Sequence, residues 1–366
     1  MSRTIILPAY LSGLGRGAAP ATDLTRISDI VVPEIFSGYI QTLTQEKSRL
    51  VQSGALVLDA RLNEDLSGGG ATFNEPFYHD LASDEGDGST TANHAENIST
   101  DKGPASTPDN IDAGTEIQVR MSCNKSWGSA DLTAALAGND PMNAIANRVA
   151  DWRTRRLQHA WLATMKGVFT TNDAAPSGGS THKAGDLTLD ISSMTGDAAK
   201  FSSSAFIAAT GLMGDSMEAL TMVMMHSVVY QRLQNLNLID YIPDARGEVM
   251  IARYMGREVI VDDGMPNDGS KFQTFLIGGG ATAMGVGSPK VPVAVKRNEE
   301  MNNGAGEEIL YNRWEWIIHP VGHAWKGTAA SKGGPSNAEL AAAGAFTRVY
   351  RERKQIRIAR LITKEA

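Results

Sequence analysis

The stretch NDPMNAIANRVADWRTRRLQHAWLATMKGVFT, from Asn139 to Thr170, decides the fold that we expect for this chain. Asp140 can cap a helix at its N-terminus, and Pro141 suits the first helical position because its φ is already fixed there. No further Pro or Gly follows until Gly167, so the sequence predicts a helix of about 27 residues, roughly 40 Å long. Helices in globular proteins average about 11 or 12 residues, so this one is unusually long.

The long helix is predicted to bury one side. Its apolar residues recur at three- to four-residue spacing, with one five-residue step, as in a helix that packs along one face. They are Met142, Ile145, Val149, Trp152, Leu157, Trp161, Met165 and Val168. Four arginines on other faces form a candidate basic face, namely Arg148, Arg153, Arg155 and Arg156. A helix this long needs a broad surface to pack on, most simply a sheet.

Composition narrows the class of protein. The 366 residues suffice for two or three structural units with a sizeable core, and 42% hydrophobic with 20% charged residues is ordinary for a soluble folded chain. A net charge of −7 argues against a chain that binds polyanions over its whole surface. The single cysteine, Cys123, excludes an internal disulfide and fits a reducing compartment. No apolar run approaches the roughly 20 residues of a membrane span, and no signal peptide is predicted.

The N-terminal third is expected to reach outward. Residues 1–27 are predicted to form an extended arm whose apolar side chains need a partner surface, and a helix is expected from near Pro33 to Gly54. Strands are predicted at 71–81 and 116–128, the second with alternating apolar and polar residues. About 35 residues rich in Gly, Ser, Thr, Asn, Asp and Pro separate them, with eight acidic residues and one lysine between positions 80 and 112.

A structureless loop of that length is unusual inside a compact domain, whereas a projecting hairpin arm accounts for it. A lone hairpin is marginal in water, so the sequence predicts that another subunit covers this arm. The candidate subunit interface consists of Phe73, Phe77, Tyr78, Val119 and Trp127.

The remaining chain predicts alternating helices and strands. A helix is expected at 206–220, an apolar strand at 220–225, a short helix capped by Ser227, and a hairpin at 249–261 that turns near Tyr254 to Gly256. Further strands are expected at 272–277 and 281–286 around a Gly278–Gly280 turn, then at 291–297 and 308–320 around a polar turn. In the basic stretch 346–366 we predict a strand with a basic face.

Three motifs could carry chemistry, and each has a simpler structural interpretation. His319 and His323 are four residues apart, but Pro320 and Gly322 prevent a helical zinc pair, which favours strand-end histidines. Asp262-Asp263 is followed by Gly264 and Pro266, as in a polar turn. The glycine-rich segment 278–287 lacks the GK[ST] ending of a phosphate loop. We therefore predict no catalytic, cofactor-binding or metal residue and no cofactor.

The order of parts, with the sequence at 31–56, 220–243 and 316–327, resembles the major capsid proteins of tailed bacteriophages with the Hong Kong phage-type fold. That resemblance implies an α+β fold and covers nearly the whole chain. Its implied parts are an N-terminal arm and helix (1–55), an extended β-hairpin loop (56–130), a peripheral domain with the spine helix (131–204), an axial domain (205–315) and return strands completing the peripheral domain (316–366).

The resemblance also implies function and partners. It implies a structural protein, not an enzyme, that assembles into pentamers and hexamers of an icosahedral head around double-stranded DNA. Implied partners are further copies of the chain, a separate scaffolding protein, a portal, a decoration protein and the packaged DNA through non-specific contact, with no membrane. The arginine face could meet that DNA or acidic surfaces of a neighbour. Alternatives are an encapsulin-type nanocompartment shell enclosing cargo, and a hydrolase or metalloenzyme using the histidine and aspartate pairs.

Overall fold

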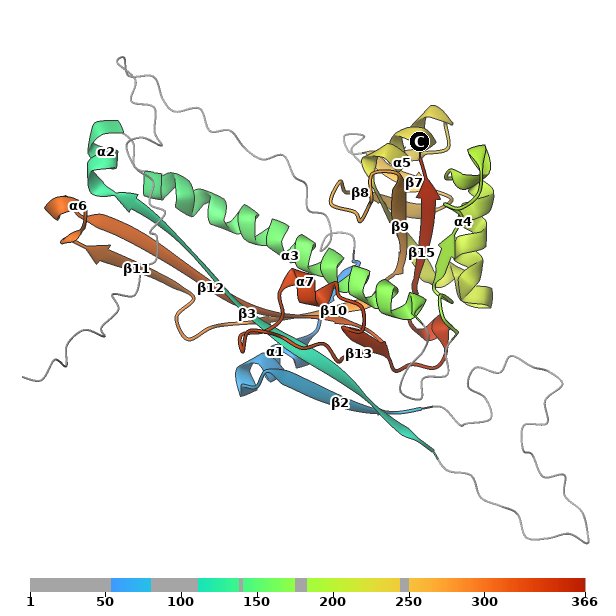
Figure 1. Ribbon diagram of the computed structural model, residues 1–366, viewed down its shortest axis with the longest axis horizontal. Coiled ribbons are helices and arrows are strands. Elements are labelled where there is room, and N and C mark those ends of the chain that lie inside the picture. The colour runs from blue at the N-terminus through green and yellow to red at the C-terminus, as the bar shows by residue number, and fades with distance from the viewer. Residues whose placement is uncertain (1–53, 80–110, 138–140, 175–182, 244–249, 366) are drawn as a thin grey trace, which may run out of the picture. The chain divides into compact units, whose positions relative to one another are not determined.

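The computed structural model describes residues 54–79, 111–137, 141–174, 183–243 and 250–365, which fall into two compact units. Within the described part, the first unit takes residues from 124–149 and 291–312, and the second takes the rest. Three long elements contribute residues to both units: β3 (Ala113–Ala130), α3 (Pro141–Asp173) and β12 (Glu307–Pro320) (Figure 1). The predicted N-terminal arm, its helix and the acidic loop lie outside the described residues.

The predicted long helix is confirmed as α3, which has 33 residues and begins at Pro141. The Asp140 cap lies outside the described residues. The expectation that the helix ends near Gly167 is wrong, because Gly167 lies inside it. A Cβ atom at this position would overlap the carbonyl oxygen of Leu340, in the short helix α7 (Asn337–Leu340). The glycine therefore serves a close approach between backbones and does not end the helix.

One sheet has six strands in the order β1-β10-β12-β3-β2, with β11 also paired to β12. Besides β3 and β12, its strands are β1 (Leu56–Leu58), β10 (Thr282–Gly287), β2 (Thr72–Tyr78) and β11 (Val293–Asn298). The second half of β12 pairs with β10 and its first half pairs with β11, which confirms the predicted polar turn between β11 and β12. Helix α1 (Ala60–Gly68), which the sequence analysis did not predict, is capped by the Asp59 side chain.

The second sheet has seven strands in the order β4-β15-β9-β5-β8-β7-β6 and lies near α4 (Ser203–Thr210) and α5 (Ser227–Asn235) in Figure 1. Its strands are β4 (Thr188–Asp190), β15 (Ile358–Lys364), β9 (Lys271–Gly278), β5 (Leu220–Met225), β8 (Arg257–Val261), β7 (Met250–Tyr254) and β6 (Asp240–Pro243). The predicted apolar strand β5 and the hairpin β7–β8 are confirmed. Strands β9 and β10 have the expected bounds but belong to different sheets, so the Gly278–Gly280 turn passes from one sheet to the other.

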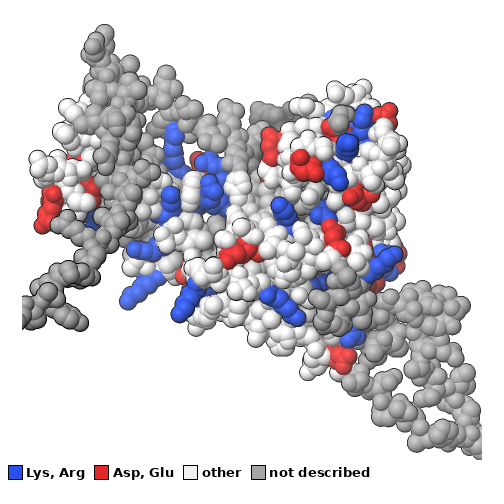
Figure 2. Space-filling view, viewed as in Figure 1, with Lys and Arg blue, Asp and Glu red and all other residues white. Residues whose placement is uncertain are grey.

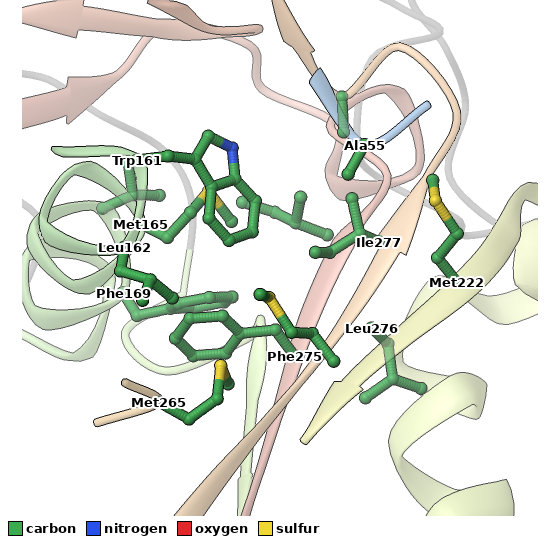
Figure 3. Close-up of a cluster of buried hydrophobic side chains, with 14 of the residues drawn as sticks. Ala55, Trp161, Leu162, Met165, Phe169, Met222, Met265, Phe275, Leu276 and Ile277 are labelled. Atoms are coloured by element: carbon green, nitrogen blue, oxygen red, sulfur yellow. The ribbon is translucent and has the colours of Figure 1, made fainter. Parts of the chain in front are cut away.

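The core of the second unit lies where α3 meets both sheets. Trp161, Met165 and Phe169 project from the helix toward Phe275 and Ile277 of β9 (Figure 3), and all five are buried. The rings of Phe169 and Phe275 lie 5.0 Å apart, and the Trp161 indole N–H donates a 3.1 Å hydrogen bond to the Thr282 hydroxyl of β10. The predicted apolar side of the helix is therefore the side that it buries.

The predicted basic face of the C-terminal strand is wrong, because its arginine is buried. Strand β15 lies between β4 and β9, and Arg360 is 3% exposed, with Asp173 as its ion-pair partner. Arg348, earlier in the same segment, is also buried and donates a 2.6 Å hydrogen bond to Asp186. Residues 358–361 are all buried, so both faces of β15 are covered and a charge on it needs a buried partner.

Two smaller expectations also change. The predicted helix at 206–220 is α4 followed by an irregular 3₁₀ segment, Gly211–Ala219, in which Gly214 has φ +59°. Helix α5 is capped by His226 and not by Ser227, because the His226 Nδ1 atom accepts a 3.2 Å hydrogen bond from the Val228 N–H. No helix in the described part of the chain is long and apolar enough to cross a membrane.

Candidate assembly interface

The predicted hairpin arm is present. Strands β2 and β3 pair antiparallel, from Thr72 opposite Val119 to Tyr78 opposite Ala113. Burial alternates along β2, so that Thr72, Asn74, Pro76 and Tyr78 are exposed while the residues between them are partly buried. One face of β2 therefore packs on its own chain and the other face is open, whereas on β3 the second face becomes buried at Val119.

The packed face is held by two aromatic contacts. Phe73 packs against a small cluster formed by Leu62 and Leu66 of α1 with Ile317 of β12. Further along β2, the Phe77 ring lies edge-on to the Tyr350 ring, with centroids 5.1 Å apart. These contacts are within the chain, so these two phenylalanines have limited surface left for a neighbour.

Among the five candidate interface residues, Tyr78 is the exposed one, at 75%. Val119 is 5% exposed and packs in the core of the second unit, so the structure assigns it to the chain's own core. Trp127 packs in the first unit against Met142, Val149 and Leu310. The open face of the hairpin thus presents one large aromatic side chain, of the kind that commonly anchors protein interfaces.

A buried carboxylate fixes the middle of the hairpin, and the sequence analysis missed it. Glu116 of β3 is 6% exposed and accepts hydrogen bonds from His319 Nε2, the Gly322 N–H and the Tyr350 hydroxyl. Burial alone would raise the pKa of Glu116, but these hydrogen bonds outweigh it and leave the pKa below its ordinary value. Burial and the nearby Glu116 charge raise the pKa of Tyr350 to about 12.

In the alternation predicted for β3, the polar residues are not all exposed. Gln118, one of the polar residues in that alternation, is 2% exposed and donates a 3.0 Å hydrogen bond to Glu75 of β2. Like Glu116, it is a buried polar residue on the face of β3 that lies beside Phe73 and Glu75 of β2. The sequence does not reveal that such a polar residue is buried, because its hydrogen-bond partners are distant in the chain.

The two candidate histidines lie at strand ends, as the structural interpretation predicts. His319 is near the end of β12, and His323 opens β13 (His323–Trp325). The Asp262 carboxylate accepts a 2.7 Å hydrogen bond from the Gly264 N–H, as expected of a polar turn. Within the described residues, no group of three or more His, Cys, Asp or Glu side chains is placed to hold a metal ion.

His323 makes the stability of the chain depend on pH. Complete burial lowers the pKa of His323 from 6.5 to about 4. The unfolded chain therefore binds a proton that the folded chain does not, so stability is full above pH 6.5 and falls as the pH drops toward 4. We expect a loss on the order of 3 kcal/mol over this range, from a shift of a few pKa units.

Urea unfolding of the unassembled chain at several pH values measures this loss. The control is His323→Leu, which should be less stable at pH 7 but should show a shallower decline between pH 6.5 and 4.5. Equal slopes for the two proteins would show that His323 does not titrate in this way.

The candidate basic face is only partly open. Arg156 is exposed and its guanidinium lies 5.3 Å from the centre of the Trp152 ring, whereas Arg148, Arg153 and Arg155 are partly buried. Figure 2 shows Lys and Arg side chains interspersed with Asp and Glu on the face that it draws, without a uniform basic surface. Whether this arginine face meets DNA or a neighbouring subunit remains a prediction.

Comparison with known proteins gives these surfaces a context. The sequence pattern of the Gp13-like family, described as "Major capsid protein 13-like", matches residues 158–357. The major capsid protein of Bacillus phage SPP1 is 34% identical over 341 residues, which cover 91% of this chain and 96% of that protein. Among solved structures, the capsid of cyanophage Pam1 matches with a TM-score of 0.54 and 12% identity, covering 94% of this chain and 99% of that one. The head of Helicobacter pylori bacteriophage KHP40 matches with a TM-score of 0.50 and 12% identity, covering 93% and 97%.

The two solved structures show that this α+β fold is a phage capsid fold of the Hong Kong type, as the resemblance implied. By its sequence, the chain belongs to the Gp13-like family of phage major capsid proteins. It is a structural protein of the phage head and not an enzyme, and its place is the virion capsid. The nanocompartment and metalloenzyme alternatives are set aside by this membership.

Proposed function

We propose that copies of this chain assemble into pentamers and hexamers, which close an icosahedral head around double-stranded DNA. The observation that carries the proposal is the open face of the β2–β3 hairpin, where Tyr78 is 75% exposed. A large aromatic residue so exposed on an edge strand is costly for a monomer and useful for a subunit that has neighbours. The solved structures of similar fold are named as a phage capsid and a phage head.

A second surface supports assembly. In the first unit, Val291, Val293 and Val295 lie at alternate positions leading into and along β11, and each is about half exposed, at 46%, 54% and 54%. Alternate positions on a strand share a face, so the three valines form one apolar stripe. Single exposed apolar residues are ordinary on a monomer, but a continuous stripe on a strand is typical of an interaction surface.

We further propose the division of the chain that the family resemblance implies, with one change. Residues 1–55 serve as the N-terminal arm, 56–130 as the extended loop, 131–204 as the peripheral domain and 205–315 as the axial domain. Strand β15 pairs with β9, so within the return segment 316–366 this strand joins the axial sheet. The pairing supports that change because a strand belongs with the sheet that completes its hydrogen bonds.

The remaining partners follow from the proposed role. A head that encloses DNA needs a scaffolding protein during assembly and a portal for the genome, and a decoration protein can bind its outer surface. The chain would touch DNA through phosphate contacts without reading its sequence. Absorbance ratios of purified heads test this part, because particles without nucleic acid would show the ratio of protein alone.

Tyr78 gives the direct test of assembly. Tyr78→Asp places a charge where we propose a neighbour, and we expect a loss of roughly 2 kcal/mol per contact, or about a 30-fold higher concentration for assembly. Tyr78→Phe keeps the ring and should assemble almost normally. Sedimentation and electron microscopy measure the shells, and urea unfolding shows whether the variant chain remains folded. Shells of Tyr78→Asp with normal yield and stability would refute the proposed interface.

The structure also shows which variants would not test the interface. Charges at Phe73 or Val119 would disrupt the chain's own packing, because Phe73 belongs to the α1 cluster and Val119 to the main core. A failure of those variants to assemble would report misfolding. The predicted pairing of the acidic loop with a basic surface falls outside the described residues, and loss of shell stability in rising salt would test it.

A further inference from the structure

The β2–β3 hairpin is attached firmly at its inner half, which runs from Thr72 to Asn74 on β2 and from Ile117 to Ser122 on β3. Phe73 packs in the α1 cluster, and Arg120 forms an ion pair with Glu315 of β12, both side chains being largely buried. The Ser122 hydroxyl donates a 3.1 Å hydrogen bond to Glu315, and its N–H donates a 2.7 Å hydrogen bond to the Gly333 carbonyl. Apolar, ionic and backbone contacts therefore all hold this half.

The outer half, with Pro76 to His79 on β2 and Asp112 to Glu116 on β3, is seated loosely. Its contacts with the rest of the chain include the Phe77–Tyr350 ring pair and a 3.2 Å ion pair between Asp112 and Arg351. Pockets of about 330 Å³ and 490 Å³ share Phe77, Tyr350 and two further lining residues. These pockets leave open space beside the ring pair.

Glu116 lies at the junction between these halves. Its carboxylate accepts hydrogen bonds from two separate stretches of chain, through His319 and Gly322 at and just after the end of β12 and through Tyr350 after β14 (Phe346–Arg348). Hydrogen bonds to a charged acceptor are about twice as strong as neutral ones, and a buried group that loses its partner pays a further penalty. One side chain of the hairpin is thus bonded to two separate stretches of the body.

We infer that Glu116 is a latch, and that the outer half of the hairpin is an arm that swings about residues 117–119 when the latch is broken. The inner half has its own contacts and stays in place. The adjoining pockets provide space for the movement, and the β2–β3 backbone pairing is retained because both strands move together. The exposed Tyr78 face then changes its direction without any strand being unfolded.

The proposed hinge movement does not depend on the proposed assembly into a shell, so it can be tested on the full-length chain before assembly. The chain has one cysteine, Cys123, and a Cys123→Ser background allows spin labels at chosen positions. One labelled pair joins the outer half to the body, Thr115→Cys with Glu218→Cys. The matched pair joins the inner half to the same site, Thr72→Cys with Glu218→Cys. All three labelling positions are in the second unit.

Pulsed electron paramagnetic resonance then gives the distance distribution for each pair. With Glu116→Gln we expect the outer distribution to broaden about twofold or more, while the inner distribution stays as in the parent chain. Tyr350→Phe keeps the ring that Phe77 contacts and removes one hydrogen bond to Glu116, so we expect a smaller broadening of the outer distribution. This variant tests the proposal if Glu116→Gln folds poorly. Asp173→Asn breaks the ion pair with the buried Arg360, away from the hairpin, and should leave both distributions unchanged.

Three results would overturn the latch. The first is an unchanged outer distribution in both Glu116→Gln and Tyr350→Phe. The second is equal broadening of the inner and outer pairs, which would mean that the whole hairpin detaches. The third is the same broadening in Asp173→Asn, which would mean that the loss of any ion pair to a buried arginine loosens the chain. Tyr78→Asp in the assembly test is independent of all three.

Discussion

Gly167→Ala is expected to destabilise the chain by more than about 3 kcal/mol, although alanine normally improves the interior of a helix by about 1 kcal/mol. The sign reverses because the new methyl group would overlap the Leu340 carbonyl oxygen and crowd the Phe346 ring. That carbonyl cannot easily retreat, since α7 is fixed by a reciprocal capping box between Ser336 and Glu339. Urea unfolding of the purified chain, and the yield of soluble protein, measure the effect.

The control for this experiment is Gly68→Ala. Gly68 is also helical, at the end of α1, and a methyl group there would meet nothing within 4 Å. We expect Gly68→Ala to be neutral or slightly stabilising. If the two variants have equal stability, then the close approach between α3 and α7 does not constrain position 167.

Trp161→Ala is expected to cost about 4 kcal/mol, within the range for a large aromatic residue removed from a core. Trp161 has no exposed surface, and it joins α3 to both sheets through the apolar cluster that it shares with Ile277 of β9 and through its hydrogen bond to Thr282 of β10. The truncation leaves a cavity and also leaves the buried Thr282 hydroxyl without this donor. Denaturant unfolding should show a lower midpoint with a similar slope.

Trp152→Ala on the same helix is the comparison. Trp152 is partly buried and lies edge-on to Trp314, with ring centroids 5.4 Å apart. Because less of its surface leaves water on folding, we expect a loss of about 1 to 2 kcal/mol. A loss for Trp161→Ala no larger than that for Trp152→Ala would show that the centre of α3 does not anchor the core.

Sequence patterns correctly predict the helices, strands and turns whose formation depends on residues close together in the chain. The apolar spacing in α3, the continuous apolar run of β5 and the turn between β7 and β8 each depend on neighbouring residues, and each is confirmed. That turn needs positive φ at Met255 and Gly256, with +49° and +80°, and a glycine at one of the two marks it in the sequence.

Contacts between distant residues decide the features that the sequence analysis missed. From the sequence alone, Gly167 resembles a helix end. Leu340, whose carbonyl oxygen requires a glycine at this position, lies far along the chain. Arg360 is read as exposed because nothing near it shows that β15 is an interior strand with Asp173 beside it. Glu116 is missed for the same reason, since its three hydrogen-bond donors lie more than 200 residues away.

The candidate interface shows the same limit. The aromatic and aliphatic residues of the hairpin stand out in the sequence, and Phe73, Val119 and Tyr78 are alike at that level. The pairing register places Phe73 on one face and Tyr78 with Val119 on the other, so only what covers each position separates the exposed Tyr78 from the packed Val119. The composition of the sequence therefore predicts the hairpin arm, but the burial of each residue is needed to choose Tyr78 for mutation.

The place of β15 in the second sheet has a consequence for how the subunit is made. This strand follows the other six in the chain, yet it lies between β4 and β9, and its Leu361 and Ala359 have no exposed surface. While the ribosome is still adding residues before β15, the sheet has an open slot and the nascent chain cannot close its core. A chain released early would keep that slot, so only fully synthesised subunits have the rigid surfaces from which a head can be built.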